Sequence, residues 1–420
     1  MRHRILLTLA LGIPIGIGAQ DPHLEKARRV LQAVPLVDGH NDLPWYIRSD
    51  YTQAPLDVEA YDLRRRTPGN TDLERLRRGM VGGQFWSVYI PGDYRDSGYA
   101  RVQLEQIDIA RRVIAKYPEL LQPALTAQDV WTAHAAGRIG SLLGMEGGHA
   151  IENSLGALRA YFDLGVRYMT LTHNVTLDWA DAAADSARHG GLTRFGEEVV
   201  REMNRLGMLV DLSHVSPATM SDALNVTEAP VIFSHSSARA LTDVPRNVPD
   251  SILARLPANG GVVMVTFVPG FVSQPVADHA ARRRAEQAAA ERRTPRDTAA
   301  VARAMARWDA DHPAPKATLA DVADHIEHVR KVAGVDHVAI GSDFDGTDNQ
   351  LPVGLEDVST FPALLAELSR RGWSEADLRK LAGENALRVM ASAERIAARL
   401  RRERPPSTRT IEELDRKRAS

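Results

Sequence analysis

Residues 36–42 read LVDGHND, and this short stretch contains the pattern on which the fold prediction depends. The apolar run Val34–Val37 predicts a buried β-strand, and His40 and Asp42 come just after it. Side chains two residues apart in an extended backbone point to the same face. We therefore expect His40 and Asp42 to face one metal ion from the carboxyl end of this strand.

The same arrangement, an apolar run that leads to an ionisable residue, recurs five times further along the chain. The residues that follow these runs are Glu146, His173, His214, His235 and Asp343. Each of them alone has an ordinary structural explanation, because a strand-end His is often hydrogen-bonded in a core and an Asp often caps a helix. Together, metal-competent residues at six strand ends indicate a metal centre.

Short apolar runs alternate with amphipathic helical segments along most of the chain. The eight runs are Val34–Val37, Gln84–Ile90, Ile139–Leu143, Val166–Leu171, Met208–Leu212, Val231–Phe233, Val262–Val268 and His337–Ile340. The helical segments between them include Tyr99–Lys116, Ser154–Leu164, Phe195–Leu206 and Pro217–Leu224. Strands that alternate with helices predict a parallel sheet with right-handed crossovers, and eight such units predict an α/β fold, a (β/α)8 TIM-type barrel.

No compositional break divides these units, so we expect one barrel domain over residues 20–400. An Ala/Arg-rich stretch at about 278–307 predicts an exposed helical excursion between the last two strands. Its arginine cluster, 282–284, is typical of a solvated helix face rather than of a nucleic-acid patch. Residues 401–420 predict a polar C-terminal tail that is poorly ordered or loosely docked.

The composition excludes several classes of protein. The chain has 420 residues, 44% of them hydrophobic and 25% charged, which excludes a mainly disordered, collagen-like or polytopic membrane protein. A net charge of -2 gives no basic excess that would point to nucleic acid. Cysteine is absent, so there is no disulfide, no thiolate zinc site and no cysteine nucleophile, and any metal must be held by His and carboxylates.

The first residues have the layout of a secretory signal peptide. A basic start, MRHR, precedes an uncharged run of 15 residues, Ile5–Ala19, and a charged stretch follows it. The run is shorter than the roughly 20 apolar residues that span a bilayer. We therefore predict a signal peptide over 1–19, cleaved near Ala19, and export to the periplasm or the medium without a stable membrane anchor.

The set of candidate ligands predicts the chemistry. Three His and three carboxylates exceed the three protein ligands of a catalytic site with a single zinc. Such a set suits two ions that share a bridging carboxylate, a pair that holds a hydroxide at neutral pH and polarises a carbonyl. The sequence therefore predicts hydrolysis of an amide or ester.

Seven segments of the chain resemble the membrane dipeptidase family of zinc peptidases, also called renal dipeptidases. They are LVDGHNDLPW (36–45), GMEGGH (144–149), TLTHN (170–174), DLSHVS (211–216), FSHSSAR (233–239), RNVPD (246–250) and GSDFDG (341–346). The resemblance runs from about residue 25 to about residue 395, in the order of the family. It implies a bacterial member with a barrel of the metal-dependent hydrolase kind, usually homodimeric. It also implies cleavage of dipeptides at a binuclear zinc site, by attack of a metal-bridging hydroxide.

The resemblance also implies a role for each matching residue. His40 and Asp42 would bind the first of two zinc ions, His214 and His235 the second, and Glu146 would bridge both. Asp343 would lie at the first zinc and move protons.

Two further residues would then contact the substrate. His173 would contact the substrate carbonyl and stabilise the oxyanion. Arg246 would bind the terminal carboxylate of the substrate.

Two other functions stay open at this point. One is another binuclear amidohydrolase, acting for example on N-acyl amino acids or lactams, although many such enzymes bridge their metals with a carboxylated lysine and no strand-end Lys is present here. The other is a periplasmic binding protein without turnover. Outside the main set, Asp345 is expected to hydrogen-bond behind the ligands, and His325 and His328 are expected to be structural.

Overall fold

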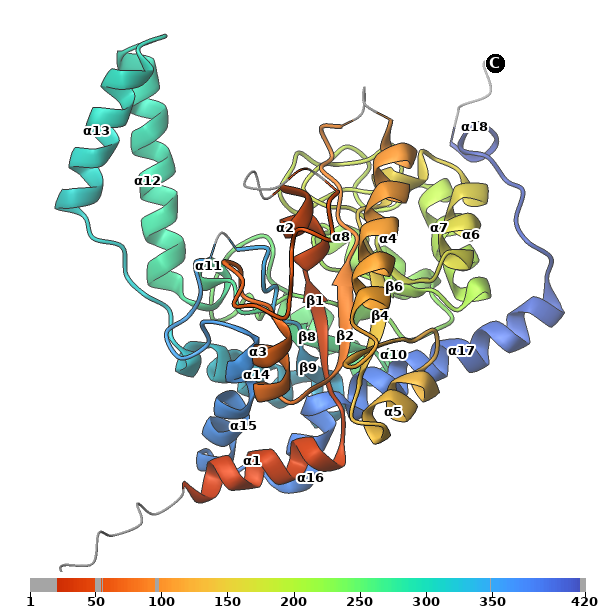
Figure 1. The fold of residues 1–420 in the computed structure, drawn as a ribbon. Helices are drawn as coiled ribbons and strands as arrows, with labels where there is room; N and C mark the ends of the chain where they lie inside the picture. The colour runs from red at the N-terminus through yellow and green to blue at the C-terminus, as the bar shows by residue number, and fades with distance from the viewer. Residues whose placement is uncertain (1–20, 50–53, 55, 95–97, 348, 416–420) are drawn as a thin grey trace, which may run out of the picture.

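The computed structural model describes residues 21–49, 54, 56–94, 98–347 and 349–415, and its centre is a closed barrel of parallel strands (Figure 1). The barrel strands are β1 (Leu36–Asn41), β2 (Val81–Ser87), β4 (Ile139–Glu146), β5 (Val166–Thr170), β6 (Leu209–Asp211), β7 (Ile232–Phe233), β8 (Val262–Val265) and β9 (Val338–Ile340). They pair in the order β2-β1-β9-β8-β7-β6-β5-β4, and a β2–β4 pairing closes the ring. The (β/α)8 TIM-type barrel predicted from the sequence is confirmed.

Each of the eight predicted apolar runs contains or overlaps a barrel strand. A further short strand, β3 (Leu121–Pro123), pairs with β4 outside the ring. All side chains of β1, β2 and β4 are buried. This burial explains why the strands read as continuous apolar runs, because both faces of a barrel strand are covered.

Helices surround the barrel and follow its strands. They are α1 (Pro22–Ala33), α2 (Leu43–Ser49), α3 (Leu73–Arg78), α4 (Tyr99–Lys116), α5 (Ala127–Ala135), α6 (Leu155–Asp163), α7 (Arg194–Leu206), α8 (Pro217–Val226), α9 (Asp250–Leu253), α10 (Leu256–Asn259), α11 (Pro269–Val272), α12 (Gln274–Arg293), α13 (Thr298–Asp311), α14 (Leu319–Ala333), α15 (Phe361–Arg370), α16 (Glu375–Arg379), α17 (Asn385–Glu403) and α18 (Ile411–Leu414). Their ends follow from local sequence. In α7, for example, the Thr193 side chain accepts from the Gly196 N–H at the start, and Gly207 ends the helix with a φ of 88°.

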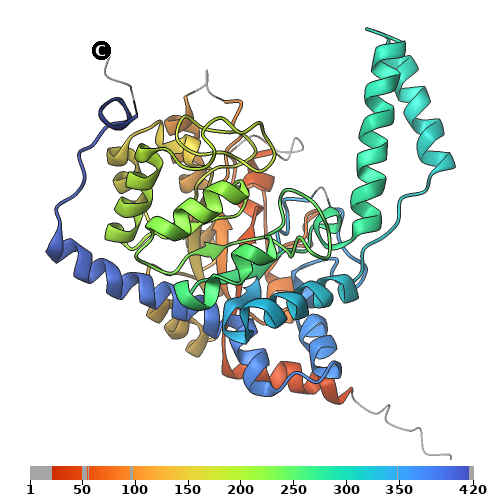
Figure 2. The same cartoon turned by 180° about the vertical axis from the view of Figure 1, so that it is seen from behind.

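Two helices, α12 and α13, form a hairpin that projects from one side of the barrel in both views (Figures 1 and 2). It lies between β8 and α14, where the sequence predicts one helical excursion. The structure has two helices there because the chain turns at 294–297, which contains Pro295. Arg283 and Asp309 join the helices through two hydrogen bonds of 2.8 and 2.9 Å.

The two ends of the described chain pack against the barrel. Helix α1 contacts α15, and Lys26 Nζ donates to the Trp373 carbonyl at 2.6 Å. Residues 401–403 of the predicted tail form the end of α17, and α18 then contacts α7, where Asp415 accepts from the Thr193 hydroxyl at 2.6 Å. The predicted signal peptide, 1–19, lies outside the described residues. Among the helices that the structure describes, none is both long and apolar enough to span a bilayer.

Candidate metal centre

The candidate ligands meet at the carboxyl end of the barrel. His40 is the second-last residue of β1, and Glu146 is the last residue of β4. The other candidate residues lie one to three positions beyond the end of a strand. A cavity of about 610 Å³ opens above them. Six predicted site residues line it: Asp42, Glu146, His173, His214, Arg246 and Asp343.

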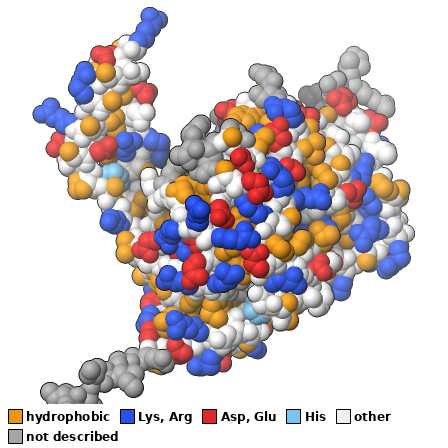
Figure 3. All heavy atoms as spheres, in the orientation of Figure 1, with side chains coloured by type: hydrophobic (Ala, Val, Ile, Leu, Met, Phe, Trp, Pro, Cys, Tyr) orange, Lys and Arg blue, Asp and Glu red, His pale blue; other side chains and the backbone are white. Residues whose placement is uncertain are grey.

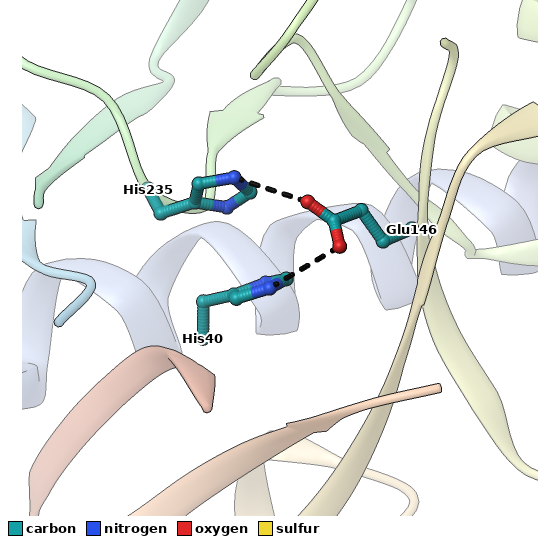
Figure 4. Close-up of side chains that lie close together, drawn as sticks. All are labelled: His40, Glu146 and His235. Atoms are coloured by element: carbon teal, nitrogen blue, oxygen red, sulfur yellow. Dashed lines mark ion pairs between the residues drawn. The ribbon is translucent and has the colours of Figure 1, made fainter. Parts of the chain in front are cut away.

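Glu146 stands at the centre of this cluster, and its two carboxylate oxygens face different partners. Oε2 lies 3.6 Å from His40 Nε2. Oε1 lies 2.9 Å from His214 Nε2 and 3.3 Å from His235 Nε2. Figure 4 shows His40 and His235 on separate oxygens of the Glu146 side chain. One carboxylate therefore lies between His40 on one side and His214 and His235 on the other.

Asp42 and Asp343 complete the group around His40. His40 Nε2 lies 3.2 Å from Asp42 Oδ2, and one ligand atom from each of His40, Asp42 and Asp343 lies within 4.8 Å of the others. Asp343 adopts a left-handed backbone conformation, with a φ of 68°. A side chain at Gly346 would come within 2.6 Å of the Asp343 carboxylate and closer still to that of Asp42, so a larger residue there would displace both carboxylates.

Two features show that these residues fit metal ions. His40 Nε2 and Asp42 Oδ1 are buried and make no hydrogen bond within the described part of the chain, which is costly unless a cation satisfies them. His214 Nε2 and His235 Nε2 face one another at 2.8 Å. Imidazole and carboxylate groups in this arrangement form a donor set that suits zinc.

Electrostatics in the cluster shift the pKa values of the candidate ligands in different directions. Burial, followed by nearby positive charge, lowers the pKa values of His214 and His235 well below the usual value, so both imidazoles are neutral. Burial alone would raise the pKa of Glu146, but the surrounding histidines bring it well below its ordinary value. Burial, together with the Asp42 and Glu146 carboxylates, raises the pKa of Asp343.

A set of side chains that we did not predict, buried except for Asn174, orients the histidines. His40 Nδ1 lies 2.7 Å from the Tyr168 hydroxyl, and His214 Nδ1 lies 3.0 Å from Asn174 Oδ1. His235 Nδ1 lies 2.8 Å from the Ser234 hydroxyl, which donates to Asp211. Such contacts fix which nitrogen faces the metal. Asn174, Asp211 and Ser234 lie inside segments that carry the family resemblance, whereas Tyr168 lies outside them.

His173 and Arg246 flank the ligands on the cavity wall. His173 Nε2 lies 3.9 Å from Glu146 Oε1, and burial lowers the pKa of His173. Arg246 is 6% exposed, and its Nε and Nη1 groups have no hydrogen-bond partner among the described residues. Its guanidinium lies 5.2 Å from the centre of the Phe271 ring on α11. A buried cation with free donors in a cavity can bind an anionic group of a ligand.

The remaining candidates lie behind or away from the ligands. Asp345 Oδ1 accepts from the Asn70 N–H at 2.5 Å, and the Asp345 backbone N–H donates to Asn70 Oδ1 at 2.9 Å. His325 is buried in α14 and accepts a hydrogen bond from the Ala238 N–H. His328 Nε2 lies 2.8 Å from Asp250 Oδ1.

Comparisons with known proteins agree on one family. The family described as membrane dipeptidase, peptidase family M19, matches residues 24–404. Dipeptidase verJ of Clonostachys rogersoniana is 43% identical over 392 residues, which cover 91% of this chain and 90% of that protein.

Solved structures share the fold over most of their length. The probable dipeptidase PvdM of Pseudomonas aeruginosa is 24% identical, with a TM-score of 0.76, over 89% of this chain and 99% of that one. A metallopeptidase from Rhodobacter sphaeroides, solved with a phosphinate mimic of the dipeptide L-Ala-D-Ala, is 25% identical, with a TM-score of 0.70. That match covers 86% of this chain and 99% of the other.

Proposed function

Because the chain belongs to the membrane dipeptidase family, peptidase family M19, and is a metallo-dipeptidase, we propose that it hydrolyses dipeptides with two zinc ions. His40 and Asp42 would hold the first ion together with Asp343, and His214 and His235 would hold the second. Glu146 would bind both. The observation that carries this proposal is that one Glu146 oxygen faces His40 and the other faces His214 and His235.

When bound, the ions would make water nucleophilic at neutral pH and polarise the carbonyl of the scissile bond. The side chains around them would supply the remaining steps. Asp343 takes the proton of the attacking water and passes it to the leaving amine, as a general base and then a general acid. His173, on the cavity wall, donates a hydrogen bond to the carbonyl oxygen as negative charge develops there.

Arg246 would limit the substrate to two residues. Its Nε and Nη1 groups have no hydrogen-bond partner among the described residues, so the guanidinium has donors left for a terminal carboxylate. A longer peptide would present a neutral amide at this point and leave the buried guanidinium without a partner. The dipeptide mimic bound to the Rhodobacter sphaeroides relative supports a ligand of this size.

A substrate panel combined with metal analysis tests the proposal. Purified protein is assayed against dipeptides, tripeptides, N-acyl amino acids and a lactam, and zinc is counted in the same sample. We expect release of free amino acids from dipeptides and two zinc ions per chain. Turnover of only N-acyl amino acids or lactams would instead assign a different amidohydrolase activity, and binding without turnover would assign a binding protein.

We further propose that the protein is a bacterial one, exported to the periplasm or the medium, and that it forms a homodimer. The signal-like layout of residues 1–19 supports export. The family resemblance, which implies a usually homodimeric protein, supports the dimer. Light scattering on the purified protein at assay concentration tests the oligomeric state. A single species with the mass of one chain would contradict the dimer.

A further inference from the structure

A second cavity, of about 660 Å³, adjoins the active-site cavity at the base of the α12–α13 hairpin. Four residues line both cavities: Pro269, Val276, Ala280 and Gln350. Val276 and Ala280 lie one turn apart near the start of α12. The base of the hairpin is therefore the common wall of the two cavities.

The hairpin reaches the active site only through this base. Helix α12 packs against α13 and, at its start, against α11. Figure 3 shows the rest of the hairpin standing clear of the barrel, with basic, acidic and hydrophobic side chains mixed on its surface. Substitutions at the base of the hairpin can thus alter the shape of both cavities without altering the packing of the barrel core.

One wall of the second cavity suits an apolar group, although His279, His312, Lys316 and Glu356 also line the cavity. Its wall includes Ala314, Pro315, Leu351 and Val353, and the Val353 side chain is exposed although it is apolar. The charged pair at its edge, Arg283 and Asp309, is already joined by two hydrogen bonds. Neither member of that pair is left to bind an opposite charge in a ligand.

Arg246 indicates which end of a substrate lies next to this cavity. The Arg246 guanidinium lies over the ring of Phe271, on α11, and α11 leads directly through Ser273 into α12. A carboxylate held by Arg246 therefore lies beside the wall that the two cavities share. The side chain nearest that carboxylate belongs to the C-terminal residue of a dipeptide.

We propose that the second cavity is a subsite for the side chain of the C-terminal residue of the substrate, and that it selects dipeptides with a large apolar residue at that position. Val276, Ala280 and Gln350 control entry to it. The proposal rests on the dipeptidase function proposed above and on the binding of the carboxylate by Arg246. It adds a preference for one class of substrate.

The test narrows the entrance from either side. Ala280→Trp narrows it from α12 and Gln350→Trp from the loop after β9. Ala281→Trp is the matched control, because Ala281 is exposed on the same helix and lines neither cavity. The substrates are Ala-Gly, Ala-Trp and Trp-Ala, and kcat/KM is measured for each. Calorimetry with non-hydrolysable phosphinate analogues of Ala-Gly and Ala-Trp measures binding without turnover.

We expect the wild-type protein to prefer Ala-Trp to Ala-Gly. Both entrance variants should lower the ratio of kcat/KM for Ala-Trp over Ala-Gly by tenfold or more, and the ratio of analogue affinities likewise. The control should keep the wild-type ratios. Equal losses on all substrates with normal metal content, or a loss confined to Trp-Ala, would overturn the proposal. If the wild-type protein cleaves no dipeptide, the proposed function fails, and the analogue affinities still decide whether the subsite exists.

Discussion

Replacement of Arg246 by Ala is expected to lower kcat/KM for free dipeptides about 10²-fold. The reason is the loss of the charge-assisted hydrogen bonds to the substrate carboxylate, which contribute about 3 kcal/mol. Burial lowers the pKa of the Arg246 guanidinium to about 10, while Asp343 and Glu146 raise it, so the group stays charged at neutral pH. Among the described residues, its Nη2 donates only to the His235 carbonyl, at 3.4 Å. The other two nitrogens are free to bind the carboxylate of a substrate.

The assay compares each free dipeptide with its C-terminal amide, which has no carboxylate to lose. The amide should be affected far less by Arg246→Ala. Arg246→Met, which keeps the aliphatic stem against Phe271, should behave like the Ala variant. Arg239→Ala, on the same loop but outside the cavity, is the control, and zinc is counted in every variant. Equal losses on the acid and the amide, or a loss of zinc, would show that Arg246 acts on the fold or the metals.

Four further outcomes are expected. Glu146→Gln should reduce activity and zinc content more than loss of any single histidine ligand, because it weakens both ions; near-normal rate and zinc content would remove the bridging role. Chelation should abolish turnover and leave the circular dichroism spectrum unchanged, because apolar packing around the barrel holds the fold without the ions; loss of helical signal would contradict this. Burial lowers the pKa of His325 to about 4, so neutral His325 contributes its full share to the free energy of unfolding above pH 6.5. The free energy of unfolding should fall by up to about 3 kcal/mol as the pH drops from 6.5 to 4. Urea unfolding of His325→Asn should show a shallower pH dependence than wild type, and identical slopes would refute the assignment. Intact-mass analysis of exported protein should show a start near Gln20, and retention of Met1 would contradict cleavage.

The barrel could be predicted because its strands are buried on both faces and so stand out as apolar runs. The strand β3 was missed because it is three residues long, has Gln122 at its centre and lies outside the ring. The hairpin was predicted as one excursion because Ala and Arg favour helix on both sides of Pro295, and composition alone does not locate the turn.

The ligand set could be predicted because strand ends in a barrel converge on one face. Its internal geometry could not, since the distances between Glu146 and the histidines depend on strand register and side-chain rotamers. The orienting contacts of Tyr168 and Asn174 join residues that are 128 and 40 positions from their histidines, and local sequence carries no trace of such pairings. The second cavity likewise depends on how the hairpin base meets the loop after β9.

The packing of α1 on α15 sets the order in which the molecule can be completed. Three polar contacts join the two regions across 346, 347 and 349 positions of the chain: His23 to Ser369, Lys26 to Trp373, and Asp21 to Arg370. During synthesis, the first helix is therefore made long before its partner and must keep its apolar face, Ala27, Val30 and Leu31, without the surface that finally covers it. Contacts of such long range slow folding, because a large loop must close before they form. The chain must therefore extend to residue 373 before all of these contacts to α1 can form.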